Sequence, residues 1–208
     1  MTTSSPHTAA ADQLTRFRRS AHWKPLEYAF WCLPVLAYFA FPGNYLLLSQ
    51  IAITALFALS LDLIFGYAGV ISLGHAAFFG IGAYTVGLLG SHGWGDPLLG
   101  LLLGAVFAGL VGFLSSFLLL RGSDLSRLMV TLGVALMIFE LANKLTSITG
   151  GVDGMPGITI GPILGRFDFD MIGRTGYIYS VIVLFVLFWL ARRLVHSPFG
   201  QSLRGIRM

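Results

Sequence analysis

The chain has 208 residues, of which 56% are hydrophobic and only 11% charged, and its formal net charge is +4 at pH 7. A soluble domain is about 25% charged, so this chain has too few polar side chains to cover a surface in water. Its apolar runs are continuous, whereas a membrane β-barrel alternates over about ten residues per strand. We therefore predict an all-α polytopic membrane protein. The basic residues lie at the ends of the apolar runs, which favours membrane topology over nucleic-acid binding.

Residues 1–24 are polar and basic and precede the first apolar run. A secretory signal peptide has an earlier apolar core, followed by a small-residue cleavage site. We therefore expect a disordered basic cytoplasmic leader over 1–24, a transmembrane domain over 25–195 and the start of a cytoplasmic loop over 196–208. The single cysteine, Cys32, excludes an internal disulfide and a cysteine-based metal site.

Six apolar runs follow the leader, each near the roughly 20 residues that cross the hydrocarbon core of a bilayer. Glycine and proline punctuate the joints between them. We expect about six transmembrane helices. The expected spans are 26–42, 45–65, 69–90, 97–120, 126–147 and 176–195.

The basic residues predict the direction of threading. With the N-terminus in the cytoplasm and each span crossing once, ten basic residues lie inside and three outside. This bias satisfies the rule that cytoplasmic flanks are enriched in Lys and Arg. The inside set is Arg16, Arg18, Arg19, Lys24, Arg121, Arg127, Arg192, Arg193, Arg204 and Arg207, and the outside set is Arg166, Arg174 and Lys144.

Small residues recur at four-residue spacing in the third and fourth spans. Lipid provides no hydrophobic drive between helices, so small side chains let two backbones approach closely. We therefore expect helices that are closely packed through small residues. The ladders are Ser72, Ala76 and Gly80, then Ala83 and Gly87, and in the fourth span Gly100, Gly104, Ala108, Gly112 and Ser116.

The third span also carries polar side chains, which a helix facing only lipid would avoid. They are Ser72, His75, Tyr84 and Thr85. Small and polar residues together predict an enclosed helix beside a pathway. A lone His in a span is as often a packing and hydrogen-bonding residue as a contact for a ligand, and both interpretations of His75 stay open.

Charged residues occur near the ends of two spans. Glu140 and Lys144 stand four residues apart with the acid first, the favourable order for a helical ion pair. The pair lies near the expected outer boundary, where Lys reaches the headgroups, so a structural interfacial pair is favoured over a functional site. Asp62, near the inner end of the second span, is interpreted in the same way.

The segment TGGVDGMPGI, residues 149–158, is rich in Gly and Pro. Its glycines permit positive φ and close turns, which favours a shaped loop over a helix. Its spacing matches neither an EF-hand nor a phosphate-binding P-loop. We expect this loop to contact an external partner or to line the outer mouth.

After the last span, Ser197-Pro198 has the pattern of a helix cap followed by a first-turn proline. We expect a short helix from about Pro198 that presents Arg204 and Arg207 to the cytoplasm.

Three stretches, in this order, resemble one family: GYAGVISLGHAAFFGIGAY (66–84), LTSITGGVDGMPGI (145–158) and HSPFGQSLRGIR (196–207). Together they are similar to the membrane permease of ABC importers for branched-chain amino acids, in particular its LivM-like member. The first motif is shared with the LivH-like partner and with urea and amide importers, and the second leans toward the LivM-like side. Because such permeases continue through further spans, we expect a fragment or a truncated gene product.

The resemblance implies a multi-pass protein of the bacterial inner membrane. It implies as partners a second, LivH-like permease, ABC ATPase subunits and a periplasmic solute-binding protein. The permease would form the path for branched-chain or related amino acids, without catalytic residues or a cofactor of its own. The sequence contains no G-x-x-x-x-G-K-[ST] nucleotide motif.

The resemblance also implies a role for each motif. The expected translocation-path residues are Gly66, Tyr67, Gly69, Ser72, His75 and Tyr84, which combine polar side chains with backbone freed at glycines. The loop on the binding-protein side has Thr149, Gly150, Gly151, Asp153 and Gly154. The ATPase-coupling segment has Ser197, Pro198, Gly200, Arg204 and Arg207, and no metal site is expected.

Two other classes of protein compete with this interpretation. A secondary transporter or channel driven by an ion gradient needs buried carboxylates at mid-membrane depth, whereas Asp62 and Glu140 lie toward span ends. An intramembrane enzyme needs a paired nucleophile and base, and the spans hold no second His near His75. The importer permease is the preferred hypothesis, with the ion-driven transporter or channel as its alternative.

Overall fold

The computed structural model describes residues 25–69, 72–119, 124–163, 165–197 and 200. Over these residues the predicted all-helical fold is confirmed, apart from one isolated antiparallel bridge between Ile163 and Phe167. The expected leader over 1–24 lies outside the described residues. In chain order the elements are α2 (Pro25–Ala40), α3 (Tyr45–Asp62), the π-helix η1 (Leu63–Ala68), α4 (His75–Ser91), α5 (Pro97–Leu119), α6 (Asp124–Lys144), α7 (Thr146–Thr149), the 3₁₀-helix η2 (Gly151–Asp153) and α8 (Arg174–Val195).

The chain divides into two compact units after Asn44, and α2 is the helix that the structure describes in the first. This helix has 16 residues and contains Pro34. Its large apolar side chains are exposed, with Phe39 75% and Leu36 62% accessible. At about 1.5 Å per residue α2 is about 24 Å long, somewhat shorter than the roughly 30 Å hydrocarbon core of a bilayer.

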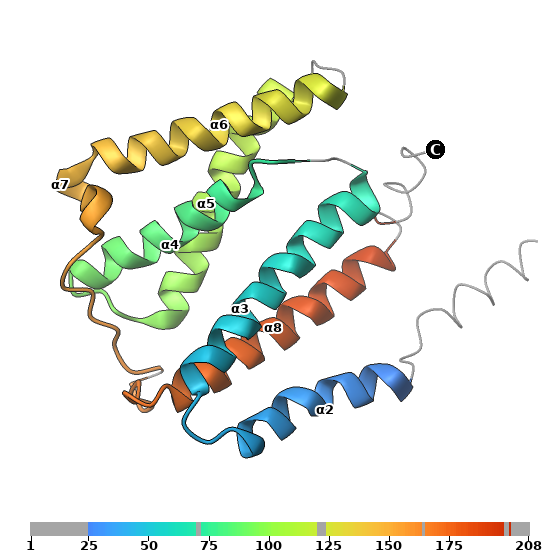
Figure 1. Cartoon of the computed structure of the whole chain (residues 1–208), viewed down its shortest axis with the longest axis vertical. Coiled ribbons are helices and arrows are strands. Elements are labelled where there is room, and N and C mark those ends of the chain that lie inside the picture. Colours follow the sequence, from blue (N-terminus) through green and yellow to red (C-terminus); the bar gives the residue numbers. More distant parts are fainter. Residues whose placement is uncertain (1–24, 70–71, 120–123, 164, 198–199, 201–208) are drawn as a thin grey trace, which may run out of the picture. The chain divides into compact units, whose positions relative to one another are not determined.

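In the second unit, α3 and α8 lie side by side and run in the same direction (Figure 1). The rings of Tyr45 and Tyr177, both buried, are 6.4 Å apart, so the first turns of the two helices meet. The guanidinium of Arg174 lies 5.7 Å from the centre of the Tyr45 ring. A Cβ on Gly173 would lie 3.0 Å from a methyl of Leu46. These contacts make α3 and α8 one packed pair.

Helix α4 packs against α5 in the opposite direction, and here the expected packing through small residues is confirmed. A Cβ on Gly104 would lie 3.3 Å from the carbonyl oxygen of Gly82. A Cβ on Gly100 would lie 3.3 Å from a methyl of Val86. The two backbones therefore approach to a distance that glycine permits and a larger side chain would widen. Helix α6 packs against both α4 and α5.

The ladder predicted in the third span is wrong in two positions. Ser72 lies before α4 and not within it. Among the described residues, nothing lies within 4 Å of a Cβ placed on Gly80. Gly80 is displaced by about 200° around the helix from Gly82, so it lies on a different face. The glycines of α4 that approach other elements are Gly82, Gly87 and Gly90.

Four described stretches are long and apolar enough to cross a membrane, namely Tyr45–Tyr67, Pro97–Phe117, Leu125–Lys144 and Arg174–Val195. Helix α4 has only 17 residues, because it begins at His75 and not at residue 69 as predicted. Helix α6 ends at Lys144, since Leu145 leaves the helical region with a ψ of 53°. The chain is therefore polytopic, with two shorter apolar helices besides the four long ones.

Contacts between helices show that α3, α4 and α5 alternate in direction, and that α8 runs in the same direction as α3 and α5. The end of α3 meets the start of α4 through Ser60 and His75. The starts of α5 and α8 meet through Pro97 and Tyr179. This alternation is what the charge pattern requires if each span crosses once. The side of the membrane on which the N-terminus lies stays a prediction.

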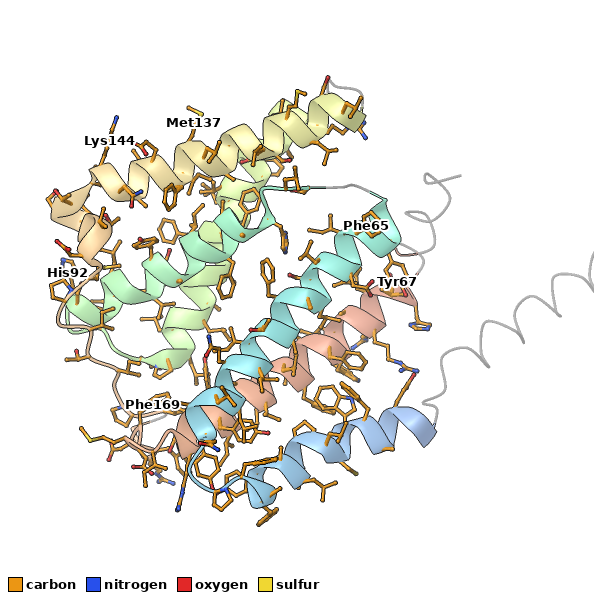
Figure 2. The ribbon with its side chains drawn as sticks, viewed as in Figure 1. Phe65, Tyr67, His92, Met137, Lys144 and Phe169 are labelled. Carbon is orange, nitrogen blue, oxygen red and sulfur yellow. The ribbon has the colours of Figure 1, made fainter. Side chains whose placement is uncertain are left out.

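The charged pair expected in the fifth span forms. Lys144 Nζ lies 3.9 Å from Glu140 Oε1, and the two side chains are 76% and 61% exposed. Figure 2 shows Lys144 projecting from the end of α6. Asp62 is exposed as well. An exposed pair at a helix end is what an interfacial, structural role requires.

Candidate functional site

The connection between α3 and α4 is the main irregularity among the long helices. The last turn of α3 widens into the π-helix η1, which closes at Gly69 with φ 68° (Figure 2, beside Phe65 and Tyr67). A Cβ on Gly66 would lie 3.2 Å from Asp62 Oδ1, so glycine lets this wider turn pass the carboxylate. Widened π turns occur often at functional sites. In a membrane, non-helical backbone of this kind needs protein or a water-filled cavity around it.

The chain re-enters α4 through Ser72–Gly74, and α6 supplies part of the surroundings. The Leu73 N–H donates to Thr131 Oγ1 at 3.2 Å, and the Gly74 N–H donates to Ser72 Oγ at 3.3 Å. A Cβ on Gly74 would lie 2.4 Å from the carbonyl oxygen of Thr131. Only glycine fits there. Thr131 was not predicted as a site residue, because a single Thr within an apolar run has no spacing signal.

His75 opens the first turn of α4 and reaches back to α3. Its Nε2 lies 2.7 Å from Ser60 Oγ, and the Ser60 hydroxyl donates to the carbonyl oxygen of Phe57 at 2.7 Å. The Phe57 ring lies 5.3 Å from the His75 ring and 5.5 Å from the ring of Phe79. His75 therefore packs and forms a hydrogen bond in this structure, and its contact with a solute stays a prediction. Ser60 and Phe57 were missed, since they belong to a different apolar run.

The predicted path residues fall into two places. Gly66, Tyr67, Gly69, Ser72 and His75 all belong to the connection between α3 and α4. Tyr84 is half-buried and lies nine residues further along α4, which is about 13 Å at 1.5 Å per residue. The structure therefore brings five of the six together and leaves Tyr84 apart.

The loop after α6 is held in shape by its first residues. The Thr149 hydroxyl, which is buried, lies within hydrogen-bond distance of the carbonyl oxygens of Ala142 and Leu145. The Gly151 N–H donates to Thr149 Oγ1 at 3.3 Å. Gly150 has a φ of 74°, and a Cβ there would overlap the Gly154 carbonyl oxygen at 1.9 Å. Thr149, Gly150 and Gly151 thus shape the loop.

The next residues form an exposed tip, where Val152 is 89% accessible and Asp153 is exposed. Gly154 continues the tip with φ 76°. Of the five predicted loop residues, only Asp153 and Gly154 are exposed, and contact with a partner stays a prediction.

The remainder of the loop lies along the C-terminal end of α4. Thr159 Oγ1 donates to the carbonyl oxygen of Gly90 at 3.0 Å, and the Gly161 N–H donates to the carbonyl oxygen of Gly95 at 2.8 Å. A Cβ on Gly90 would lie 2.9 Å from a methyl of Ile158. Glycines at these positions let the loop approach the helix end closely.

The segment after α8 begins with a capping bond. The Gly200 N–H donates to Ser197 Oγ at 3.3 Å, which is the bond that an N-cap serine accepts from the third helical residue. A Cβ on Gly200 would lie 2.4 Å from the carbonyl oxygen of Val195. The predicted coupling residues Pro198, Arg204 and Arg207 lie outside the described residues. Within the part of the chain that the structure describes, no group of His, Cys, Asp and Glu is arranged to hold a metal ion.

The profile of a family described as "Branched-chain amino acid transport system / permease component" matches residues 45–208. The chain is 31% identical over 179 residues to the high-affinity branched-chain amino acid transport system permease protein LivM of Escherichia coli strain K12. It is 31% identical over 177 residues to the LivM protein of Salmonella typhimurium strain LT2. In each case the match covers 72% of this chain and 40% of the relative. No solved structure matches.

Proposed function

The chain belongs to the family of branched-chain amino acid transport permease components, and on this premise we propose that it acts as a membrane permease subunit of an ABC importer. The match over residues 45–208 carries this proposal, because it includes every long helix of the second unit. The chain spans about 40% of the length of the curated relatives it matches. We propose branched-chain or related amino acids as the transported solutes, and the bacterial inner membrane as the location.

The α3–α4 connection is our candidate for the translocation path. An amino acid with an apolar side chain needs a modestly apolar path, and its ammonium and carboxylate groups need hydrogen-bonding partners. The connection offers the hydroxyl of Ser72, the imidazole of His75 and irregular backbone around Gly66 and Gly69. Irregular backbone at membrane depth is tolerated where it lines a cavity. Tyr67, in the same π-helix, and Tyr84, further along α4, would extend the path.

The loop after α6 is our candidate for contact with a periplasmic solute-binding protein. The exposed tip at Val152 and Asp153 is supported on both sides, by bonds to α6 before it and to α4 after it. A rigidly supported tip is suited to docking, because little conformational freedom is lost on binding.

The segment after α8 is our candidate for the contact with the ATPase. The Gly200 N–H donates to Ser197 Oγ, and Arg204 and Arg207 would add basic side chains on the cytoplasmic side. A second, LivH-like permease would complete the membrane domain. We propose that the chain has no catalytic residues and that the partner ATPase hydrolyses ATP.

Uptake by reconstituted vesicles tests this proposal. The full gene product is assembled with its cognate permease partner, ATPase and binding protein, and uptake of labelled leucine is measured. We expect uptake that requires ATP hydrolysis and persists when the proton gradient is collapsed. Uptake that continues without ATP hydrolysis and stops with the gradient would instead establish the ion-driven transporter. An ATPase variant unable to hydrolyse ATP is the matched control.

A further inference from the structure

We propose that Ser60 is a positioning residue for His75, and that their bond is one of two polar links whose alternate breaking opens the permease at one end and then at the other. The second link joins Tyr179 to Pro97. This inference rests on the proposed importer function, since it assigns the residues that control the movement.

Two packed sets of helices lie on either side of these links. The α3–α8 pair is joined by the contacts of Tyr45 with Tyr177 and of Leu46 with Gly173. The α4–α5–α6 group is joined by the approach of Gly82 to Gly104 and by the contact of Gly74 with Thr131. Each set is held by apolar surface and glycine contacts, which leave few alternative arrangements.

The first link, Ser60–His75, lies where α3 ends and α4 begins. Ser60 Oγ and His75 Nε2 are 2.7 Å apart. The Ser60 hydroxyl also lies 2.7 Å from the Phe57 carbonyl oxygen, to which it donates, so Ser60 Oγ is held between this oxygen and Nε2. The serine thereby fixes the direction of the His75 ring.

An aromatic side chain packs against the His75 end of this link. The Phe57 ring lies 5.3 Å from the His75 ring at an interplanar angle of 40°, and Phe79 packs edge-on against Phe57. In apolar surroundings an unpaired imidazole or hydroxyl is costly, so the bond is either made or replaced by water or solute. A hydrogen bond of this kind is either formed or broken, and a conformational switch requires two discrete states of this sort.

The second link, Tyr179–Pro97, joins the same two sets of helices through a different pair, α8 and α5. The Tyr179 hydroxyl, on the second turn of α8, donates to the carbonyl oxygen of Pro97 at the start of α5, at 3.1 Å. Tyr179 also packs edge-on against Phe169. α3 and α8 run in parallel from Tyr45 and Tyr177, so this link and Ser60–His75 lie toward opposite ends of the α3–α8 pair. A rocking movement between the two sets of helices would open one link while the other holds.

Side-specific labelling of a cysteine tests the proposal. The reporter is Ser72→Cys in the full-length permease with Cys32→Ser, assembled with its partners in membrane vesicles of known orientation. An impermeant maleimide is applied from either side. Ser60→Ala is expected to raise labelling from the cytoplasmic side about fivefold, the effect of one lost hydrogen bond on a two-state equilibrium. Tyr179→Phe is expected to lower it by a similar factor.

The controls distinguish the loss of a specific hydrogen bond from a general destabilisation of the helix packing. Ser60→Thr keeps a hydroxyl and is expected to label like the parent. Thr54→Ala removes a hydroxyl of α3 that bonds only along its own helix, to the Gln50 carbonyl oxygen, and is expected to change nothing. Changes in the same direction for Ser60→Ala and Tyr179→Phe, or equal labelling of Ser60→Ala and Thr54→Ala, would overturn the proposal. Labelling does not depend on transport. If the two variants shift labelling in opposite directions but the assembled protein shows no ATP-driven uptake, the importer function is rejected and the two links are retained.

Discussion

The flank of α4 and its first turn show two ways of joining helices in a membrane. Against α5, glycines bring two backbones together, with Gly104 almost touching Gly82. Toward α3, the first turn of α4 makes a polar contact through His75, next to a backbone that leaves the α-helix altogether. Glycine packing has one close-packed solution, whereas a hydrogen bond can be exchanged with water or solute. We therefore expect α4 and α5 to move together and the α3–α4 connection to be the moving part.

The largest effect is expected for Gly74→Ala. The new Cβ would lie 2.4 Å from the carbonyl oxygen of Thr131, a backbone atom that cannot rotate away. We expect the free energy of unfolding to fall by about 3 kcal/mol, the upper end of the usual cost of overpacking, because the site cannot yield. The measurement is the thermal unfolding of the purified permease in detergent. Gly80→Ala is the matched control, since nothing described lies within 4 Å of its Cβ, and it should unfold like the parent. If the two variants unfolded at the same temperature, the backbone at Gly74, just before α4, would not be enclosed by α6.

A smaller but clear effect is expected for Gly104→Leu, which tests the other side of the comparison. The side chain would push α5 away from Gly82 and destabilise the pair by about 1–3 kcal/mol. Gly109→Leu, on the same helix with nothing described within 4 Å, should have little effect. Recovery of folded protein by size-exclusion chromatography checks both. A Gly104→Leu variant that is recovered as well as Gly109→Leu would mean that α4 and α5 do not pack through these glycines.

Thr131→Val is expected to destabilise the α3–α4 connection less than the two glycine substitutions destabilise their contacts. It removes the acceptor for the Leu73 N–H, which should lower stability by about 1–2 kcal/mol. Thr85→Val removes a hydroxyl that bonds only within α4, to the Ile81 carbonyl oxygen, and should change stability less. Hydrogen exchange at the Leu73 amide provides the specific measurement, with faster exchange expected for Thr131→Val alone. Unchanged exchange would remove Thr131 from the account.

The smallest effect on stability is expected at the loop tip, in Asp153→Ala. This exposed side chain can be changed without disturbing either helix contact, so unfolding should shift by less than about 0.5 kcal/mol. Stimulation of ATP hydrolysis by the solute-loaded binding protein should nevertheless fall several-fold. Thr149→Val, in contrast, should reduce both stability and stimulation, because it removes the buried bonds that shape the loop. Normal stimulation in Asp153→Ala would place the docking contact elsewhere.

The sequence predicted the helical class and the glycine packing because both depend on local patterns. Apolar runs of sufficient length identify α3, α5, α6 and α8, and four-residue spacing identifies the α5 face that meets α4. The start of α4 was placed too early, since an apolar run gives no sign that the helix begins only at His75.

The polar contacts of the site were harder to predict, because each joins residues that are far apart in the chain. His75 is evident as a polar residue in a span, but its partner Ser60 is 15 residues earlier and Thr131 is 58 residues after Leu73. The loop motif predicted a shaped loop at the correct residues. It did not predict which of these residues are buried, such as Thr149, and which are exposed, such as Asp153. Glycine spacing therefore specifies packing, whereas the connectivity of polar groups needs the three-dimensional fold.

Solute protection at the α3–α4 connection tests most directly whether this connection lines the path. A cysteine in place of Ser72, in the assembled importer with Cys32→Ser, is modified by a water-soluble maleimide with and without leucine and its binding protein. A cysteine in place of Phe113, a 64% exposed apolar residue of α5, serves as the comparison. We predict that residue 72 is modified readily and that leucine slows its modification, while residue 113 stays unaffected by leucine. Modification of residue 72 at the same rate with and without leucine would contradict the account.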